Sequence, residues 1–251
     1  MVKQANRQRR QRIRMGVILF TFLLFPIVMN FLSPYVIIDG AFQGIISGSF
    51  LLFGGLFISS LFVGRLWCSW ACPAAGLQEA AFTVNNHRVR GKRLNWIKWV
   101  IWVLWIAVIM LGFITNGGIT KVDPLYLTES GISVDAPEKY VIYYFVLAIV
   151  FGLSIFIGRR AFCHAGCWMS PFMILGRKLR NLANTPALRL TAETEKCTNC
   201  MKCTRNCPMS LDVNAMVQAG NMENAECILC GKCIDNCPES VIHYAFKPGR
   251  S

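Results

Sequence analysis

The last 55 residues of this 251-residue chain repeat one cysteine pattern, and the repeat limits what that segment can fold into. Each copy has the spacing C-x2-C-x2-C-x3-C-P. The cysteines are Cys197, Cys200, Cys203 and Cys207 in the first copy and Cys227, Cys230, Cys233 and Cys237 in the second. A segment of about 60 residues is too small to build a large apolar core. We therefore expect that groups bound by the thiols hold it together.

The repeat has the spacing with which bacterial two-cluster ferredoxins hold 4Fe–4S clusters. Three thiolates of one copy bind one cluster, and the fourth binds the cluster of the other copy. Zinc is the main alternative, but zinc knuckles usually pair two C-x2-C units across a longer spacer. The spacing rule assigns cluster one to Cys197, Cys200, Cys203 and Cys237, and cluster two to Cys227, Cys230, Cys233 and Cys207.

The first 160 residues are apolar and predict a membrane domain. Hydrophobic residues make up 54% of the whole chain and charged residues only 16%. A helix needs about 20 apolar residues to cross a bilayer. Lys98 lies near the end of one such segment, where its side chain can reach the interface. We expect four transmembrane helices, over residues 15–38, 41–64, 94–114 and 140–158.

The positive charges predict the orientation of these helices. Of the 26 Lys and Arg residues, 24 lie on one side, and only Lys121 and Lys139 lie in the loop before the fourth segment. Because basic residues accumulate on the inner side, we expect a multi-pass protein of the cytoplasmic membrane. Both termini and all clusters would face the reducing cytoplasm, where disulfides are rare. The net charge of +13 then indicates contact with membrane lipid, and no nucleic acid is expected as a partner.

The remaining cysteines form two C-x3-C pairs where the second and fourth segments meet the cytoplasm. If a helix continued through each pair, its two sulfur atoms would lie on one face. A third iron–sulfur cluster is the leading interpretation, with a structural or redox-active dithiol and a bound copper or zinc ion as alternatives. His164 is a candidate for a hydrogen bond beside this site. The four cysteines are Cys68, Cys72, Cys163 and Cys167.

Residues 161–186 would join the two halves. They contain the second C-x3-C pair, a basic and apolar helix over 169–182 on the cytoplasmic membrane face, and the start of a linker over 181–195. Residues 187–251 would then fold as a small α+β ferredoxin domain. The expected fold class is thus a membrane α-helical protein with a four-helix bundle and a C-terminal two-cluster domain.

The chain resembles the NapH-type and NosR-type membrane iron–sulfur proteins, which are polyferredoxin-like and related to the CcoG-type proteins. The four apolar segments, the element Cys68-Ser-Trp-Ala-Cys72-Pro73, the second C-x3-C pair and the terminal repeats carry this resemblance. It implies electron exchange between the quinone pool, or flavin and haem partners, and a dedicated reductase. Trp168 follows Cys167 where the family pattern has a proline.

The sequence alone therefore predicts an electron relay. The leading hypothesis is a membrane subunit, similar to a quinol dehydrogenase component, that exchanges electrons with a quinone or a membrane partner and with a cytoplasmic reductase or ferredoxin. Lys196, Lys202, Arg205 and Lys232 would suit an acidic partner. A copper or iron reductase or metal-assembly factor is one alternative, and a tethered redox sensor or anchor is another.

Overall fold

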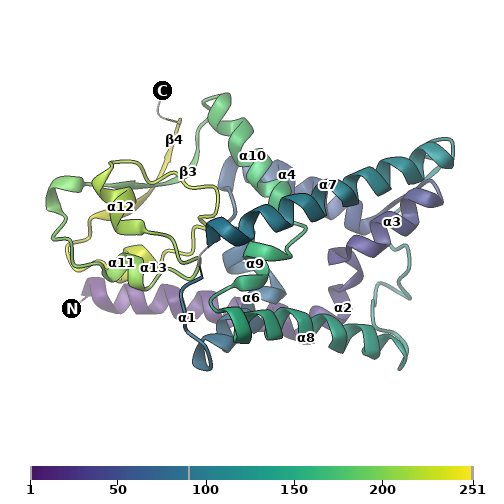
Figure 1. Ribbon diagram of the computed structural model, residues 1–251, viewed down its shortest axis with the longest axis horizontal. Helices are drawn as coiled ribbons and strands as arrows, with labels where there is room; N and C mark the ends of the chain where they lie inside the picture. Colours follow the sequence, from purple (N-terminus) through teal and green to yellow (C-terminus); the bar gives the residue numbers. More distant parts are fainter. Residues whose placement is uncertain (1, 90, 250–251) are drawn as a thin grey trace.

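The structure, a computed structural model, describes residues 2–89 and 91–249. Figure 1 shows an elongated molecule in which the cysteine-rich tail lies at one end and the loop between α7 and α8 at the other. Four residues of the regions predicted above lie outside the described residues: Met1, Arg90, Arg250 and Ser251.

The first predicted crossing is not one helix. The helix α1 ends at Leu23, and Pro26 follows within the short α2, where its ring removes a backbone N–H donor. Ser33 is extended because a residue before proline is pushed out of the helical region, and Pro34 then starts a new helix. The prediction of a continuous helix over 15–38 is therefore wrong. The elements are α1 (Val2–Leu23), α2 (Phe25–Val28), η1 (Asn30–Leu32) and α3 (Pro34–Phe42).

The second predicted crossing starts later than expected. Ile45–Ser47 form the strand β1, which pairs in parallel with β2 (Lys121–Asp123). The helix α4 then runs over Gly48–Val63. A Cβ atom at Gly48 would lie 2.2 Å from the carbonyl oxygen of Pro124, so only glycine allows this close approach. The prediction of a helix over 41–64 is correct for its second part and wrong for residues 43–47.

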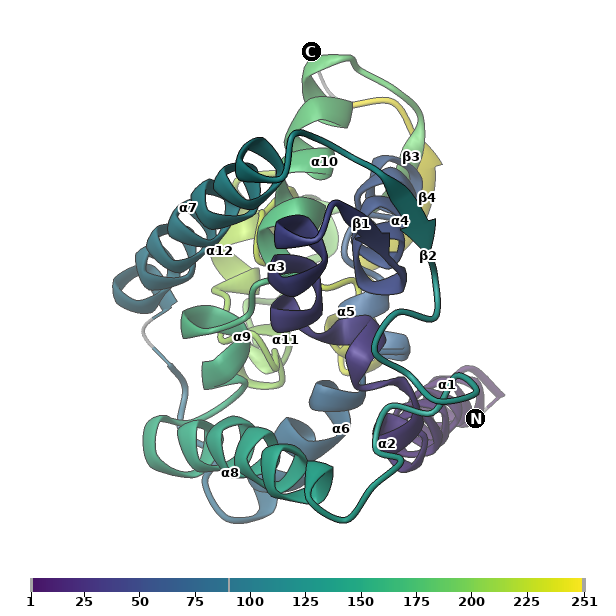
Figure 2. The same ribbon diagram turned by 90° about the vertical axis from the view of Figure 1, so that its right-hand side faces the viewer.

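The third and fourth predicted segments are long helices. They are α7 (Gly91–Thr115) and α8 (Lys139–Ile157). Within the described residues, two helices are long and apolar enough to cross a membrane, and only 22% and 17% of their apolar windows are buried. The helix α4 is apolar but shorter. Figure 2 shows α3 and α9 between α7, α8 and α4.

Short elements carry the C-x3-C pairs between these helices. The helix α10 packs along α4, while α6 packs against α1 and α8. These elements place both pairs of cysteines inside the molecule. They are α5 (Trp67–Trp70), α6 (Pro73–Ala80), η2 (Ala81–Thr83), α9 (Ala161–Ala165) and α10 (Ser170–Leu182).

The tail has the internal symmetry of its sequence repeat. The short helices α11 (Lys202–Arg205) and α13 (Lys232–Asp235) are 30 positions apart, as are the repeated cysteines. Left-handed backbone angles recur at the same offset, at residues 199 and 229, 201 and 231, and 210 and 240. The strand β3 pairs antiparallel with β4, Ala187 opposite Lys247. The other elements are β3 (Ala187–Ala192), η3 (Thr194–Lys196), α12 (Val213–Gln218) and β4 (Ile242–Lys247).

The tail is docked on the apolar half rather than tethered to it. Lys98 does not reach outward as expected: it is fully buried, and its Nζ lies 2.7 Å from Glu226 of the tail. The predicted linker over 181–195 contains the end of α10 and all of β3. The expected interfacial helix forms as α10, but its Arg177 and Arg180 are buried and face Glu223 of the tail.

The substitution Glu226→Gln tests this docking. Glu226 is 8% exposed and pairs with Arg65 and Lys98, each at 2.7 Å. Removing the anion leaves two buried cations unpaired, so we expect the free energy of unfolding to fall by about 3–5 kcal/mol. Thermal denaturation of the detergent-solubilised protein measures this. The exposed Glu195→Gln is the control, and equal melting temperatures for the two variants would contradict the role of Glu226.

Candidate iron–sulfur sites and their connection

Four cysteines of the second predicted cluster line one cavity in the tail. Three come from the second repeat, and Cys207 comes from the first. Burial raises the pKa of Cys207 to about 12, and the neighbouring Cys230 adds to that effect. Buried thiols that raise one another's pKa release protons when they bind a metal. The cavity is lined by Cys207, Cys227, Cys230 and Cys233, together with apolar side chains such as Ile228 and Met209.

The first predicted set lines a second cavity. Cys237 of the second repeat meets three cysteines of the first repeat there, so the two sets exchange one cysteine each. Asn199 and Met201 adopt left-handed backbone angles within this loop, which bends the chain tightly around the cavity. The structure thus brings together the sets that the spacing rule assigns. The cavity is lined by Cys197, Cys200, Cys203 and Cys237.

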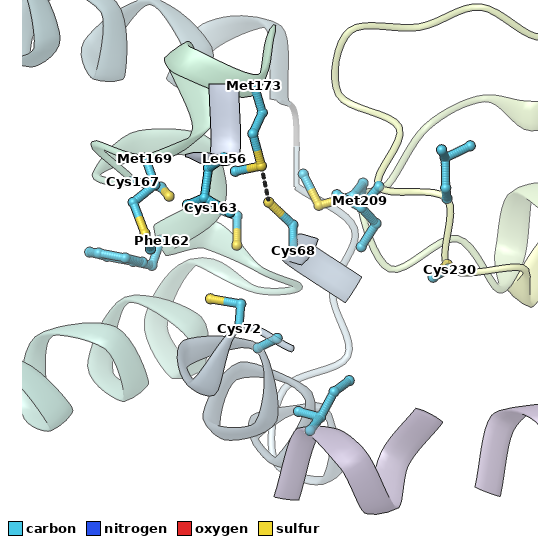
Figure 3. Packing of buried hydrophobic residues seen from close by; sticks show 14 of the residues in the cluster. Leu56, Cys68, Cys72, Phe162, Cys163, Cys167, Met169, Met173, Met209 and Cys230 are labelled. Carbon is cyan, nitrogen blue, oxygen red and sulfur yellow. Dashed lines mark hydrogen bonds between the residues drawn. The ribbon is translucent and has the colours of Figure 1, made fainter. Parts of the chain in front are cut away.

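The two C-x3-C pairs also meet. Figure 3 shows Cys68, Cys72, Cys163 and Cys167 around one point at the junction of the two halves, and all four are buried. The Sγ of Cys68 lies 3.9 Å from the Sδ of Met173 on α10. Burial raises the pKa of Cys72 strongly, and the other three thiols raise it further. The four cysteines form a set of four thiols, as does each of the two sets in the tail.

The local backbone at this third set differs from the prediction. No helix continues through either C-x3-C pair within the described residues. The helix α5 ends at Trp70, and Cys72 precedes Pro73 at the start of α6. In the second pair, α9 ends at Ala165, before Cys167. A break between the two cysteines of each pair lets both sulfur atoms turn to the same point.

Polar groups around the third set fix its geometry. The Nε2 of Gln78 donates to the Sγ of Cys163 at 3.3 Å, and its Oε1 accepts from the backbone N–H of the same residue. Arg160 donates to the carbonyl oxygen of Cys68 at 2.7 Å. A sulfur that accepts hydrogen bonds and lies near cations is stabilised in its charged form. Gln78 lies on α6, close to the first pair in sequence but 85 positions from Cys163, so its contact with the second pair could not be predicted from the sequence.

His164 lies between the cysteines of the second pair and is 1% exposed. Its Nδ1 is 2.8 Å from the Oδ1 of Asn95 on α7. Burial lowers the pKa of His164 to about 4, and the positive charges of Lys98 and Arg65 lower it as well. The ring is therefore neutral near pH 7 and joins α9 to α7. Its assignment as a residue beside the third set stays a prediction.

The carboxylates that hold the two halves together are the functional residues that the sequence did not reveal. Three carboxylates each form ion pairs with two or more cations from distant segments: Glu79, Glu223 and Glu226. Although burial acts to raise its pKa, the charge of Arg160 and hydrogen bonds from Arg14 hold the pKa of Glu79 well below its ordinary value. Lys232, expected to face an acidic partner, donates to Glu79 of the same chain at 3.1 Å.

Comparisons with known proteins agree with this chemistry. Residues 189–240 match the family model described as "4Fe-4S dicluster domain". Residues 46–96 and 141–182 match the model described as "4Fe-4S binding domain", which covers both C-x3-C pairs. The chain therefore binds 4Fe–4S clusters, and its ferredoxin-type domains make it an iron–sulfur electron-transfer protein. Among the described residues, no group of three or more His, Cys, Asp or Glu side chains is placed to hold a single metal ion.

Similar proteins carry names of the same kind. The chain is 26% identical over 199 residues to the "Methylamine utilization ferredoxin-type protein MauN" of Paracoccus denitrificans, and 25% identical over 193 residues to that of Methylobacillus flagellatus. It is 21% identical over 201 residues to the "Putative electron transport protein YccM" of Escherichia coli. The matches cover 72%, 72% and 75% of this chain but only 62%, 62% and 54% of those relatives. No solved structure matches.

These similarities bear out the prediction of ferredoxin-type electron transport. The narrower resemblance to NapH-type and NosR-type proteins stays a prediction, as does the ligation of each cluster by particular cysteines.

Replacing Cys72 by Ser tests the third set. If that set holds a 4Fe–4S cluster, the iron content should fall from about twelve to about eight atoms per chain. The EPR signals of the two tail clusters should persist. Iron analysis of the anaerobically purified protein measures the change, and Ser69→Ala, a neighbouring buried residue, should leave it unaltered. Equal iron content in Cys72→Ser and the unsubstituted protein would exclude Cys72 as a ligand.

Proposed function

We propose that the protein is a membrane-bound electron-transfer subunit. It would pass electrons between a lipid-soluble quinone and a cytoplasmic partner, through sites formed by all twelve cysteines. The observation that carries this proposal is the position of the third set. It lies at the end of the apolar half, while Met209, which lines the cavity of the second set, lies between Cys68 and Cys230 (Figure 3).

Iron–sulfur clusters supply one-electron chemistry, and the protein sets their potentials through burial, charge and hydrogen bonds to sulfur. The residues of this chain would bury the third set, hydrogen-bond to it through Gln78 and hold it against the second. Cys197 and Cys200 are more exposed than the cysteines of the third set. The first set would therefore be the place where a soluble partner exchanges electrons.

The surface of the apolar half supports a membrane location. Large apolar side chains are exposed along both long helices, including Leu104 at 63%, Val141 at 72% and Phe156 at 86%. Exposed apolar surface on this scale is unfavourable in water and suits contact with lipid tails. In this proposal the broken series from α1 to α3 forms the first crossing, and α4, α7 and α8 form the others. The basic residues would keep both termini and the clusters in the cytoplasm.

An apolar cavity supports a quinone as the membrane reactant. It has a volume of about 280 Å³ and lies between α1, α2 and α4 and the first C-x3-C element. Trp67 and Ala71 line it, and they are the neighbours of Cys68 and Cys72 in sequence. Trp67 forms part of the cavity wall, and its indole N–H has no hydrogen-bond acceptor among the described residues. Sites for small ligands are commonly lined by apolar and aromatic side chains in this way.

The reaction balances with such a site. Oxidation of a quinol to the quinone releases two electrons and two protons, and the electrons suit centres that each take one. A flavin- or haem-bearing membrane protein is the other reactant expected from the sequence, but a cavity of this size favours a small ring.

A copper site is a second candidate function. The thioether of Met173, which lies near the third set, is a soft ligand that would suit copper. Metal analysis separates this candidate function from electron transfer.

The substitution Val28→Trp tests the quinone site. Val28 lines the cavity and belongs to α2 rather than to either cysteine element, so an indole there should fill the space and leave every residue of the third set in place. We expect reduction of the clusters by a short-chain quinol to slow by about tenfold or more. Reduction by dithionite and the iron content should not change.

Ile27→Trp is the matched control, because Ile27 is the preceding residue but is 42% exposed. It should reduce as fast as the unsubstituted protein. If Val28→Trp and Ile27→Trp accept electrons from the quinol at the same rate, the cavity is not the quinone site. If the unsubstituted protein does not react with quinol at all, a protein donor replaces the quinone.

A further inference from the structure

We propose that Glu79 is a positioning residue that sets the reduction potentials of the second and third cysteine sets together. It does so by holding a surplus of buried cations between them. This inference rests on the proposed function, because it assumes that both sets carry clusters.

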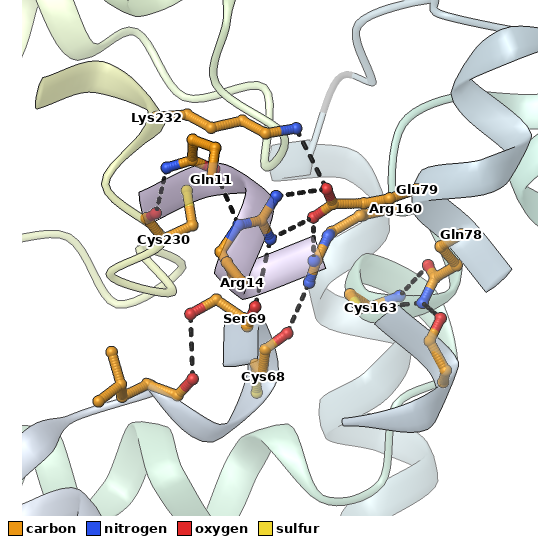
Figure 4. Close-up of polar contacts among 12 residues, drawn as sticks. Gln11, Arg14, Cys68, Ser69, Gln78, Glu79, Arg160, Cys163, Cys230 and Lys232 are labelled. Carbon is orange, nitrogen blue, oxygen red and sulfur yellow. Dashed lines mark hydrogen bonds and ion pairs between the residues drawn. The ribbon is translucent and has the colours of Figure 1, made fainter. Parts of the chain in front are cut away.

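Glu79 is a junction between three segments of the chain. It is 5% exposed, and both of its carboxylate oxygens accept hydrogen bonds (Figure 4). Arg14 of α1 donates to Oε1 at 2.9 Å and to Oε2 at 2.6 Å. Arg160 also donates to Oε1, and the Nζ of Lys232 lies 3.1 Å from Oε2. One carboxylate therefore orders cations from the N-terminal helix, the loop after α8 and the tail.

On one side, these cations reach the backbone of the third set. Arg160 donates to the carbonyl oxygen of Cys68 at 2.7 Å, and Arg14 donates to that of Ser69 at 3.2 Å. Two guanidinium groups thus hold the loop that carries the first C-x3-C pair through its backbone carbonyl oxygens.

On the other side, the same network reaches the second set. Arg14 donates from Nε to Gln11 at 2.9 Å, and Gln11 donates to the carbonyl oxygen of Cys230 at 3.1 Å. Lys232 lies between two cysteines of that set in sequence. Burial acts to lower the pKa of Arg160, but Glu79 together with Cys163 and Cys230 raises it above its ordinary value. The charges of cysteines from both sets therefore act on Arg160.

The charges in this network do not balance by themselves. Arg14, Arg160 and Lys232 bring three positive charges to one carboxylate, and both arginines are fully buried. A buried cation without an anion is costly. Thiolate-bound clusters on both sides would supply the missing negative charge, and the surplus cations in turn would favour the reduced, more negative state of each cluster.

Two substitutions that change the local charge in opposite directions test the inference. Glu79→Gln removes the carboxylate that Arg14, Arg160 and Lys232 share, so the midpoint potentials of the second and third clusters should both shift to more positive values. Lys232→Met removes a cation, so the potential of the second cluster should shift to a more negative value. EPR-monitored redox titration of the complete protein measures the potentials without quinol or partner. The first cluster is farther along the chain of sites and should shift least.

Glu138→Gln, the same change at an exposed residue of the loop before α8, is the matched control and should leave every potential unaltered. A purely structural role of Glu79 would not make the two variants shift in opposite directions. Unchanged potentials, or shifts of the same sign in both variants, would overturn the inference. If Glu79→Gln does not fold, Lys232→Met decides, because the Lys232 side chain is 23% exposed. Only two EPR signals in the unsubstituted protein would instead overturn the proposed function.

Discussion

Burying a cation is unfavourable unless an anion and hydrogen bonds meet it, and this constraint shapes the junction between the two halves of the molecule. Arg14, Arg65, Lys98 and Arg160 are fully buried there. Each is met by a carboxylate from a distant part of the chain, Glu79 or Glu226. These pairs give the tail one defined position on the apolar half. With the tail in that position, Met209 lies between Cys68 of the third set and Cys230 of the second (Figure 3).

The organisation of the tail could be read from the sequence because the chemistry of a cluster fixes the spacing of its ligands. The exchange of Cys207 and Cys237 between the two cavities follows from that rule, and the structure places them in this way. The duplication also extends to the backbone, where Asn199 and Leu229 share a left-handed angle. The meeting of the two C-x3-C pairs was expected as well, since both lie at the same end of apolar segments.

Other features could not be read from composition and local pattern. By hydropathy, residues 15–38 form one apolar run, but Pro26 and Pro34 interrupt the helix within it. Lys98 looked like a residue at the membrane surface because its partner, Glu226, follows 128 positions later. The roles of Glu79 and Gln78 likewise depend on contacts between segments that are far apart in sequence. The pattern of a single sequence predicts ligand groups whose spacing along the chain is fixed by what they bind. It does not predict which surfaces pack together.

The most direct test of this account is the EPR spectrum of the fully reduced protein, recorded together with its iron and sulfide content. The central claim is that a docked tail holds the second cluster beside a third one. It predicts about twelve irons per chain and a third signal that is broadened by magnetic interaction with a tail cluster. About eight irons per chain, with the spectrum of an ordinary two-cluster ferredoxin, would contradict it.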